Sequence, residues 1–136
     1  MKIKIIDFGA EHLPYRAHYN DAGADVYAKE SVTIWPGDTI KIPLGFGLEL
    51  PDGYAAYVFP RSGWASKGLT CELPPIDSGY RGEIHAIVTN CSNTLKCYVS
   101  KGDRIGQLVI LPCVIADFVT EDVQERGSNG FGSTGK

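Results

Sequence analysis

The sequence has no excess of positive charge and lacks the marks of a secreted, membrane or zinc-finger protein. Thirteen Lys and Arg stand against 16 Asp and Glu, a formal net charge of −3, so we expect no nucleic-acid partner. The amino-terminal residues carry only a very short apolar stretch, so we expect neither a signal peptide nor a membrane span. The four cysteines have no C-x-x-C spacing and no histidines at zinc-finger distances, which favours reduced thiols and a cytoplasmic protein.

Long helical patterns are also missing. Sixteen glycines and eight prolines interrupt the chain, and no window carries a sustained apolar stripe at helical spacing. The apolar runs are short and rich in β-branched and aromatic residues, as in strands. They predict strands at Lys2–Ile6, Thr39–Ile42, Phe46–Leu50, Ala55–Phe59, Glu83–Thr89, Lys96–Val99 and Gln107–Phe118. The only predicted helical turn is Trp64–Lys67, which Gly68 ends. Many short strands with frequent turn residues predict one all-β sandwich or barrel.

Two strands carry further signals. In Glu83–Thr89, alternation places Ile84, Ala86 and Val88 on one face, as in a half-buried antiparallel strand. In the last run, Pro112 predicts an edge position or a bend, because proline cannot donate to a strand ladder.

The carboxyl-terminal residues, from Arg126 onward, read RGSNGFGSTGK and differ from the rest. One aromatic among glycines and small hydroxyl residues cannot bury enough surface to offset chain entropy, so we expect this tail to be mobile alone. An idle terminus is one interpretation. The other is a phosphate-clasping loop, since glycines let N–H groups converge on an anion and Arg126 supplies a forked cation.

Two segments combine polar groups with glycines that strand packing does not require. In DAGAD, Asp21 and Asp25 form either a site for a hydrated Mg²⁺ or an exposed acidic turn. In PRSGWASKG, Arg61, Ser62 and Gly63 stand where a strand turns into the short helix, an arrangement typical of an anion site. The segment lacks the spacing of a P-loop.

Two more segments follow. In PPIDSGYRGE, Asp77 next to Tyr80 suits a general base beside a ring that packs on a substrate; the alternative is a charged hairpin with a structural tyrosine. In GDRIGQ, Gln107 enters a buried strand and needs hydrogen-bond partners, of which a bound water is one candidate.

Together with the tail, these segments match in order five motifs of the trimeric dUTPase family, which the chain resembles over nearly its whole length. The motifs read DAGADVYA (Asp21–Ala28), PRSGWASKG (Pro60–Gly68), PPIDSGYRGE (Pro74–Glu83), GDRIGQLVI (Gly102–Ile110) and RGSNGFGSTG (Arg126–Gly135). Five ordered motifs are far more specific than any single one.

The resemblance implies a fold, an assembly and a reaction. The fold would be an all-β, jelly-roll-like distorted β-barrel (β-clip) over residues 1–125, with residues 126–136 as a flexible lid over a neighbouring subunit's active site. The assembly would be a homotrimer with active sites shared between subunits. The reaction would be hydrolysis of dUTP to dUMP and pyrophosphate with Mg²⁺, which limits uracil in DNA and supplies dUMP for thymidylate synthesis.

The resemblance also implies roles for single residues. Asp77 would activate the water that attacks the α-phosphorus, and Gln107 would position that water or the adjacent phosphate. Asp25 would contact Mg²⁺ through water, and Tyr80 would exclude a 2′-hydroxyl. The phosphates would be gripped by Arg61, Ser62 and Gly63. The base would be read along the hairpin by Pro75, Ile76 and His85. In the tail, Phe131 would stack on uracil while the γ-phosphate is held by Arg126, Gly132, Ser133 and Thr134.

The chain departs from the family pattern in the third motif. Pro74 and Pro75 stand where the family often has a glycine, and Cys71–Leu73 stands near its asparagine. Prolines remove two N–H donors, which leaves the strictness of uracil selection open. Trp64 stands where the family often has leucine, and we expect it only to pack.

Two other functions are weighed against dUTP hydrolysis. A dCTP deaminase has a related fold but needs a glutamate beside the base and has no such Ile-Asp-x-x-Tyr hairpin, and the zinc-deaminase signature is absent. A binding protein without turnover would be expected to lack some of Asp25, Asp77, Gln107, Arg126 and Phe131, all of which are present.

Overall fold

The computed structural model describes residues 1–122, which form a domain built almost entirely of strands. The elements are β1 (Lys4–Asp7), β2 (Ala24–Tyr27), β3 (Val32–Ile34), β4 (Thr39–Pro43), β5 (Phe46–Glu49), β6 (Tyr54–Pro60), α1 (Ser62–Ala65), β7 (Leu69–Glu72), β8 (His85–Asn90), β9 (Cys97–Val99) and β10 (Arg104–Pro112). All the strand pairs are antiparallel and lie in four small sheets, ordered β1-β5, β2-β10-β6, β3-β9 and β4-β8-β7.

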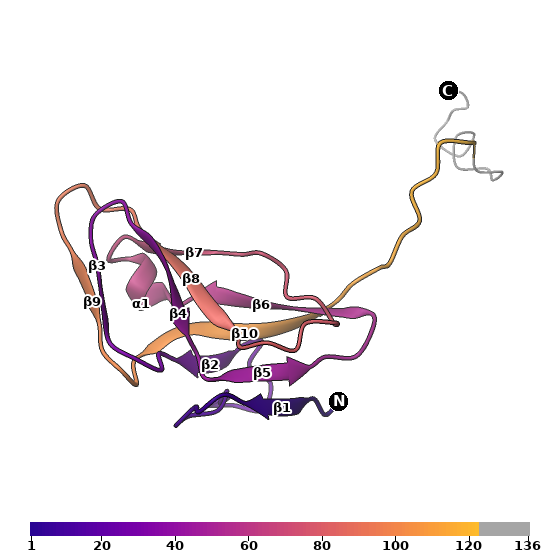
Figure 1. The fold of residues 1–136 in the computed structure, drawn as a ribbon, viewed down its shortest axis with the longest axis horizontal. Coiled ribbons are helices and arrows are strands. Elements are labelled where there is room, and N and C mark those ends of the chain that lie inside the picture. The colour runs from indigo at the N-terminus through magenta and orange to yellow at the C-terminus, as the bar shows by residue number, and fades with distance from the viewer. Residues whose placement is uncertain (123–136) are drawn as a thin grey trace.

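The four sheets, whose arrangement Figure 1 shows, enclose one apolar core. Its largest fully buried side chains are Phe46, Ile34, Ile42, Leu44, Leu69, Ile84, Ile105, Val26, Val88 and Val99. They come from strands throughout the chain and, for Leu44 and Ile84, from the residues next to strands, so every sheet depends on its neighbours for burial. The predicted all-β, jelly-roll-like architecture is confirmed.

The predicted strands are confirmed with shifted ends. Ile84, Ala86 and Val88 are buried, as the alternation requires, although β8 begins only at His85. The last run was predicted too long, because β10 ends at Pro112 instead of Phe118. Pro112 pairs with Tyr54, the first residue of β6, so beyond this point that ladder has no partner strand. The strands β2, β3 and β7 were missed; each has only three or four residues.

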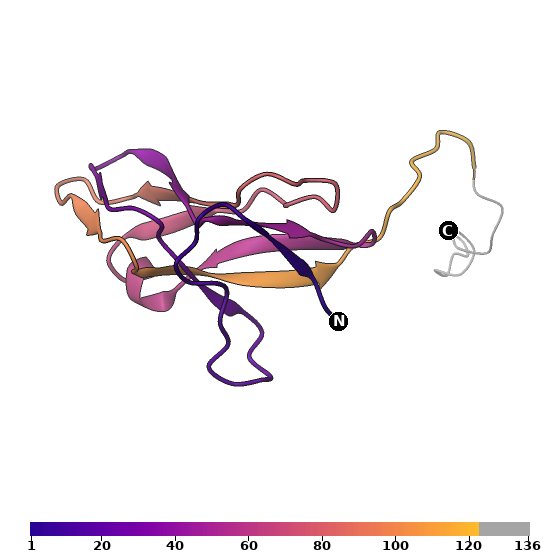
Figure 2. The same cartoon turned by 60° about the horizontal axis from the view of Figure 1, so that its bottom comes forward.

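Residues 113–122 leave the domain body after β10 (Figures 1 and 2). Cys113 still donates its backbone N–H to the Gly53 carbonyl at 2.8 Å. Val114 and Phe118 are 90% and 96% exposed. Such exposed apolar side chains on a projecting segment are typical of a surface that meets another protein chain.

The structure of residues 1–122 bears on two expectations from the sequence, the absence of a membrane span and the presence of reduced cysteines. No helix in this part of the chain has the length and apolar content needed to cross a bilayer. All four cysteines are free. Burial raises the pKa of the Cys71 thiol to about 11, which keeps it protonated and unreactive at neutral pH.

Candidate active site

The segment between β7 and β8 forms a hairpin that carries Asp77. Before it, Ile76 exchanges two backbone hydrogen bonds with Ala56 of β6, at 2.9 and 3.1 Å. After it, the Ser78 hydroxyl donates to the Asp52 carboxylate at 3.2 Å, and Tyr80 N–H donates to the Asp77 carbonyl at 3.1 Å. Asp77 is therefore fixed at both sides. Its exposed carboxylate makes no hydrogen bond or ion pair with any residue in 1–122, so it is free to accept a proton.

A pocket of about 210 Å³ opens between this hairpin and the outer face of the β4-β8-β7 sheet. Five residues predicted from the sequence, Pro75, Ile76, Asp77, Tyr80 and His85, line it together. Sequence reasoning missed three charged residues of the lining, Lys41, Glu72 and Glu83. The pocket therefore combines apolar walls with charged groups, the usual character of a small-molecule site.

Lys41 and Glu72 belong to one row across the sheet. Ile87 of β8 stands opposite Lys41 of β4 on one side and opposite Glu72 of β7 on the other. Directly paired residues share a face, so the two charges flank Ile87 with Cα atoms about 10 Å apart. The Thr89 hydroxyl donates to Glu72 at 3.3 Å. No local motif signals this row, because its members are far apart in the sequence.

A second cluster forms on the β2-β10-β6 sheet. Asp25 of β2 is paired with Gln107 of β10, so their side chains lie on one face. A Cβ on Gly23 would stand 2.8 Å from the Gln107 Cβ, which explains why glycine is needed beside it. The meeting of Asp25 from the first motif with Gln107 from the fourth is thus a consequence of strand register.

Two arginines surround the Asp25 carboxylate, whose side chain is only 12% exposed. Arg61 Nε lies 3.6 Å from one oxygen and Arg104 Nη1 lies 3.6 Å from the other. Two cations around one carboxylate leave a local positive charge in a chain whose net charge is −3. The cluster therefore suits an anion such as a phosphate group.

The two carboxylates of the DAGAD segment have different surroundings. Asp21 accepts a hydrogen bond from the His18 backbone N–H at 2.9 Å and belongs to that turn. Within residues 1–122 no group of three His, Cys, Asp or Glu side chains comes together as a metal cage. Asp25 lies beyond hydrogen-bond distance of both arginines, so its oxygens retain acceptor capacity for water.

The short helix α1 places Arg61, Ser62 and Gly63 at the end of β6. Arg61 is its N-cap residue, with extended backbone, and Ser62 and Gly63 are exposed in the first turn. The helical turn was predicted two residues late, but Gly68 does follow it with φ of +86°.

Trp64 does more than pack, contrary to expectation. Its indole N–H donates to the Arg104 carbonyl at 2.7 Å and so ties α1 to the start of β10.

Within one chain the two clusters lie at opposite ends of β6. Ile76 pairs near the start of this strand, and Arg61 follows its end. Figures 1 and 2 show the same separation between the hairpin and α1. The strand spans roughly 20 Å, and the pocket lining includes none of Asp25, Arg61 and Gln107. The predicted tail residues Arg126, Phe131, Gly132, Ser133 and Thr134 lie outside the described residues.

Comparisons with known proteins agree on one family. The family model described as dUTPase matches residues 10–135. The deoxyuridine 5'-triphosphate nucleotidohydrolase of Leifsonia xyli subsp. xyli is 47% identical, over 93% of this chain and 87% of the relative. That of Thermobifida fusca is 45% identical, over 90% of this chain and 72% of the relative.

Solved structures give the same result. A mutant dUTPase from phage phi11 of S. aureus, described with the coordination of a structural Mg(II) ion, matches with a TM-score of 0.79 at 25% identity, covering 92% of this chain and 98% of that chain. A mutant of Staphylococcus bacteriophage 80alpha dUTPase with dUpNHpp matches with a TM-score of 0.81 at 27% identity, covering 99% of both chains.

Proposed function

This chain belongs to the dUTPase family, and from that premise we propose that it hydrolyses dUTP to dUMP and pyrophosphate through attack of water on the α-phosphorus. It is thus a hydrolase, a dUTP nucleotidohydrolase. The reaction would limit uracil in DNA and supply dUMP for thymidylate synthesis. Two features together carry the proposal. The Asp77 carboxylate, which makes no hydrogen bond with residues 1–122, lines a nucleoside-sized pocket, and a separate arginine cluster suits phosphates.

Asp77 is the general base in this scheme. Its carboxylate makes no hydrogen bond with residues 1–122. It therefore accepts a proton from the attacking water without breaking a structural contact. Gln107 offers both amide donors and an acceptor, which lets it orient the water or hold the neighbouring phosphate oxygen. Phosphoryl transfer needs positioning and charge stabilisation more than covalent help, and these two groups supply positioning.

Arg61, Ser62 and Gly63 hold the phosphates. The guanidinium gives forked donors, the hydroxyl gives one more, and the exposed glycine lets a phosphate approach the backbone. Mg²⁺ usually keeps several waters and binds through substrate phosphates and one or two carboxylates. Asp25, nearly buried beside Arg61 with acceptor capacity left, fits a contact through water. The ion would neutralise part of the triphosphate charge.

The pocket takes the deoxyuridine part. Tyr80 packs on the sugar and leaves no room for a 2′-hydroxyl, while the base lies along Pro75, Ile76 and His85. Uracil would have to be recognised by remaining backbone groups and by the charged lining, because neither proline has an N–H to donate.

In a homotrimer with shared sites, the pocket of one chain could lie next to the arginine cluster of another. The base and the phosphate cluster stand at opposite ends of β6, so one chain's pocket needs another chain's arginines. The exposed apolar residues of 113–122 support such an assembly, since they project from the domain. Residues 126–136 would then close over a neighbour's site, with Phe131 on the base and Arg126, Gly132, Ser133 and Thr134 at the γ-phosphate.

The test incubates the protein with Mg²⁺ and each deoxynucleoside triphosphate in turn, and measures pyrophosphate and ammonia separately. Pyrophosphate from dUTP, with little from dTTP or dCTP, is the expected result. Ammonia from dCTP would instead assign the chain to the deaminases, and absence of any product would favour a binding protein.

A further inference from the structure

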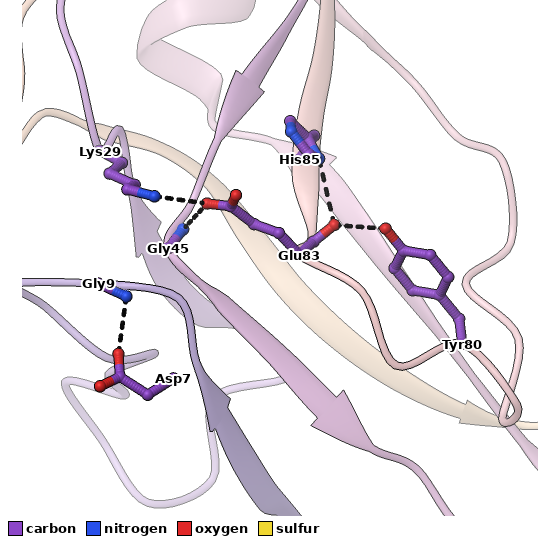
Figure 3. Close-up of polar contacts among 7 residues, drawn as sticks. All are labelled: Asp7, Gly9, Lys29, Gly45, Tyr80, Glu83 and His85. Atoms are coloured by element: carbon purple, nitrogen blue, oxygen red, sulfur yellow. Dashed lines mark hydrogen bonds and ion pairs between the residues drawn. The ribbon is translucent and has the colours of Figure 1, made fainter.

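Glu83 holds the returning arm of the hairpin to the rest of the domain. One carboxylate oxygen accepts the Gly45 backbone N–H at 2.8 Å and lies 3.3 Å from Lys29 Nζ (Figure 3). The side chains are partly buried, 20% exposed for Glu83 and 33% for Lys29. An ion pair that is partly withdrawn from water and completed by an N–H donor fixes its members more firmly than a surface pair does.

The backbone of the same residue holds two side chains of the pocket. The Glu83 carbonyl accepts the Tyr80 hydroxyl at 2.7 Å and lies 3.2 Å from His85 Nδ1, as Figure 3 shows. Both Tyr80 and His85 line the pocket. The carboxylate is thus bonded to the domain body, and the carbonyl is bonded to the groups that face a substrate.

The neighbouring backbone restricts the position of the Tyr80 ring. A Cβ on Gly82 would stand 2.5 Å from the Tyr80 hydroxyl oxygen, so the ring occupies the space that a side chain there would fill. The Gly82 carbonyl in turn lies 2.6 Å from where a Cβ on Gly47 would be, so this arm packs directly on the β5 backbone. The ring position therefore follows the position of the arm.

We propose that Glu83 and Lys29 are positioning residues that set the distance between the Tyr80 ring and the sugar, and thereby the preference for deoxyribose over ribose. The inference rests on the proposed function, in which Tyr80 packs on the sugar. A 2′-hydroxyl is excluded only if the ring cannot retreat. Without the Glu83 anchor, residues 80–83 are held to the domain by the packing of Gly82 on Gly47 and by the backbone bonds of Ile84 with Phe46 and Leu44, which lets the arm shift away from the pocket.

The experiment compares Glu83→Ala, Glu83→Gln and Lys29→Met with a matched control, Lys4→Met. The control removes an exposed ion pair to Glu49, 3.8 Å long, that also reaches β5 but lies away from the pocket. The quantity measured is the ratio of kcat/KM for dUTP to kcat/KM for UTP. Calorimetric Kd values for dUMP and UMP report the same preference without turnover.

Glu83→Ala should lower the dUTP/UTP ratio on the order of tenfold or more, since a misplacement of about 1 Å at a positioned group has effects of this size. Glu83→Gln should lower it less, because the amide oxygen still accepts the Gly45 N–H. Lys29→Met should also lower the ratio and should add nothing in a Glu83→Ala background. Lys4→Met should leave it unchanged.

A Glu83→Ala protein that loses thermal stability but keeps the wild-type ratio would show that the residue is only structural and would overturn the inference. If Glu83→Ala does not fold, Lys29→Met and Glu83→Gln decide by the same ratio. Should the wild-type protein fail to cleave dUTP, the proposed function is wrong, whereas the dUMP/UMP binding preference still tests the anchor.

Discussion

Asp25 stands directly opposite Gln107 in the β2–β10 ladder, and the two arginines that flank Asp25 lie at the ends of strands. Arg104 begins β10 itself, whereas Arg61 follows β6 on the other side of that strand. The register of one central strand thus brings three of the sequence motifs to a single place. This arrangement gives a local excess of positive charge at a nearly buried carboxylate, as phosphate binding requires.

Trp64 connects this cluster to α1, so its indole N–H should matter for stability and for phosphate binding. Trp64→Phe removes the donor to the Arg104 carbonyl and keeps an aromatic ring. We expect a loss of about 1 kcal/mol in unfolding free energy and a raised KM for dUTP. Urea unfolding at fixed protein concentration and steady-state kinetics measure the two effects.

Trp35→Phe is the matched control, because Trp35 is exposed and its ring is covered by the Lys96 ammonium, 5.2 Å from the ring centre. It should leave KM unchanged. An unaltered KM in Trp64→Phe would mean that the link from α1 to β10 does not influence the phosphate site.

Much of the fold was predictable from local pattern, and long-range pairing was not. Ile84, Ala86 and Val88 are buried as their alternation predicts, because burial on one face of a strand is a local property. The sequence marks Pro112 as an edge position or a bend, but the length of β10 is set by its pairing with β6, which begins at Tyr54. The site divides in the same way. Asp77 and Tyr80 are neighbours in one motif, whereas Glu83 reaches Lys29 and Gly45, 54 and 38 residues away.

The row of Lys41, Ile87 and Glu72 leads to a prediction about the base. A carboxylate only accepts hydrogen bonds, so Glu72 suits the N3–H of uracil and repels the N3 lone pair of cytosine. Glu72→Gln offers a donor as well, and should lower the ratio of kcat/KM for dUTP to that for dCTP by about tenfold. Lys41→Met should instead reduce activity toward dUTP, since uracil O4 loses a donor. A Glu72→Gln protein with unchanged discrimination would place the base elsewhere in the pocket.

Removal of residues 126–136 should leave the fold intact and remove most activity. The apolar core lies within the described residues, so the circular dichroism spectrum and the number of chains in the assembly should be unchanged. The segment supplies Arg126 and Phe131, and a charge at the γ-phosphate acts strongly where water is excluded, so kcat/KM should fall by about 10²-fold or more. Phe131→Ala should be milder, and Phe131→Trp milder still. Wild-type kcat/KM in the truncated protein would mean that this segment is an idle terminus.

The shared site predicts that two inactive variants restore each other. Asp77→Asn keeps the shape of the side chain and removes the proton acceptor of the general base. We therefore expect kcat to fall by about 10²–10⁴-fold while dUTP binding is retained. Arg61→Met removes a phosphate donor at the opposite end of β6 and should also be inactive, mainly through KM. In the proposed trimer each site joins the Asp77 pocket of one chain to the Arg61 cluster of another. Each variant therefore retains the half-site that the other lacks.

Mixing the two variants, unfolding them together and refolding them should consequently regenerate some complete sites. With random assembly at equal amounts, about a quarter of the sites combine an intact pocket with an intact cluster, so about a quarter of wild-type activity should return. The control mixes Asp77→Asn with Asp77→Ala, which damage the same half-site and should stay inactive. Light scattering should give roughly three times the chain mass of 14.8 kDa for every mixture. If the first mixture stays as inactive as the control while its mass is that of a trimer, both halves of the site must come from one chain, and the separation along β6 must close by movement within that chain.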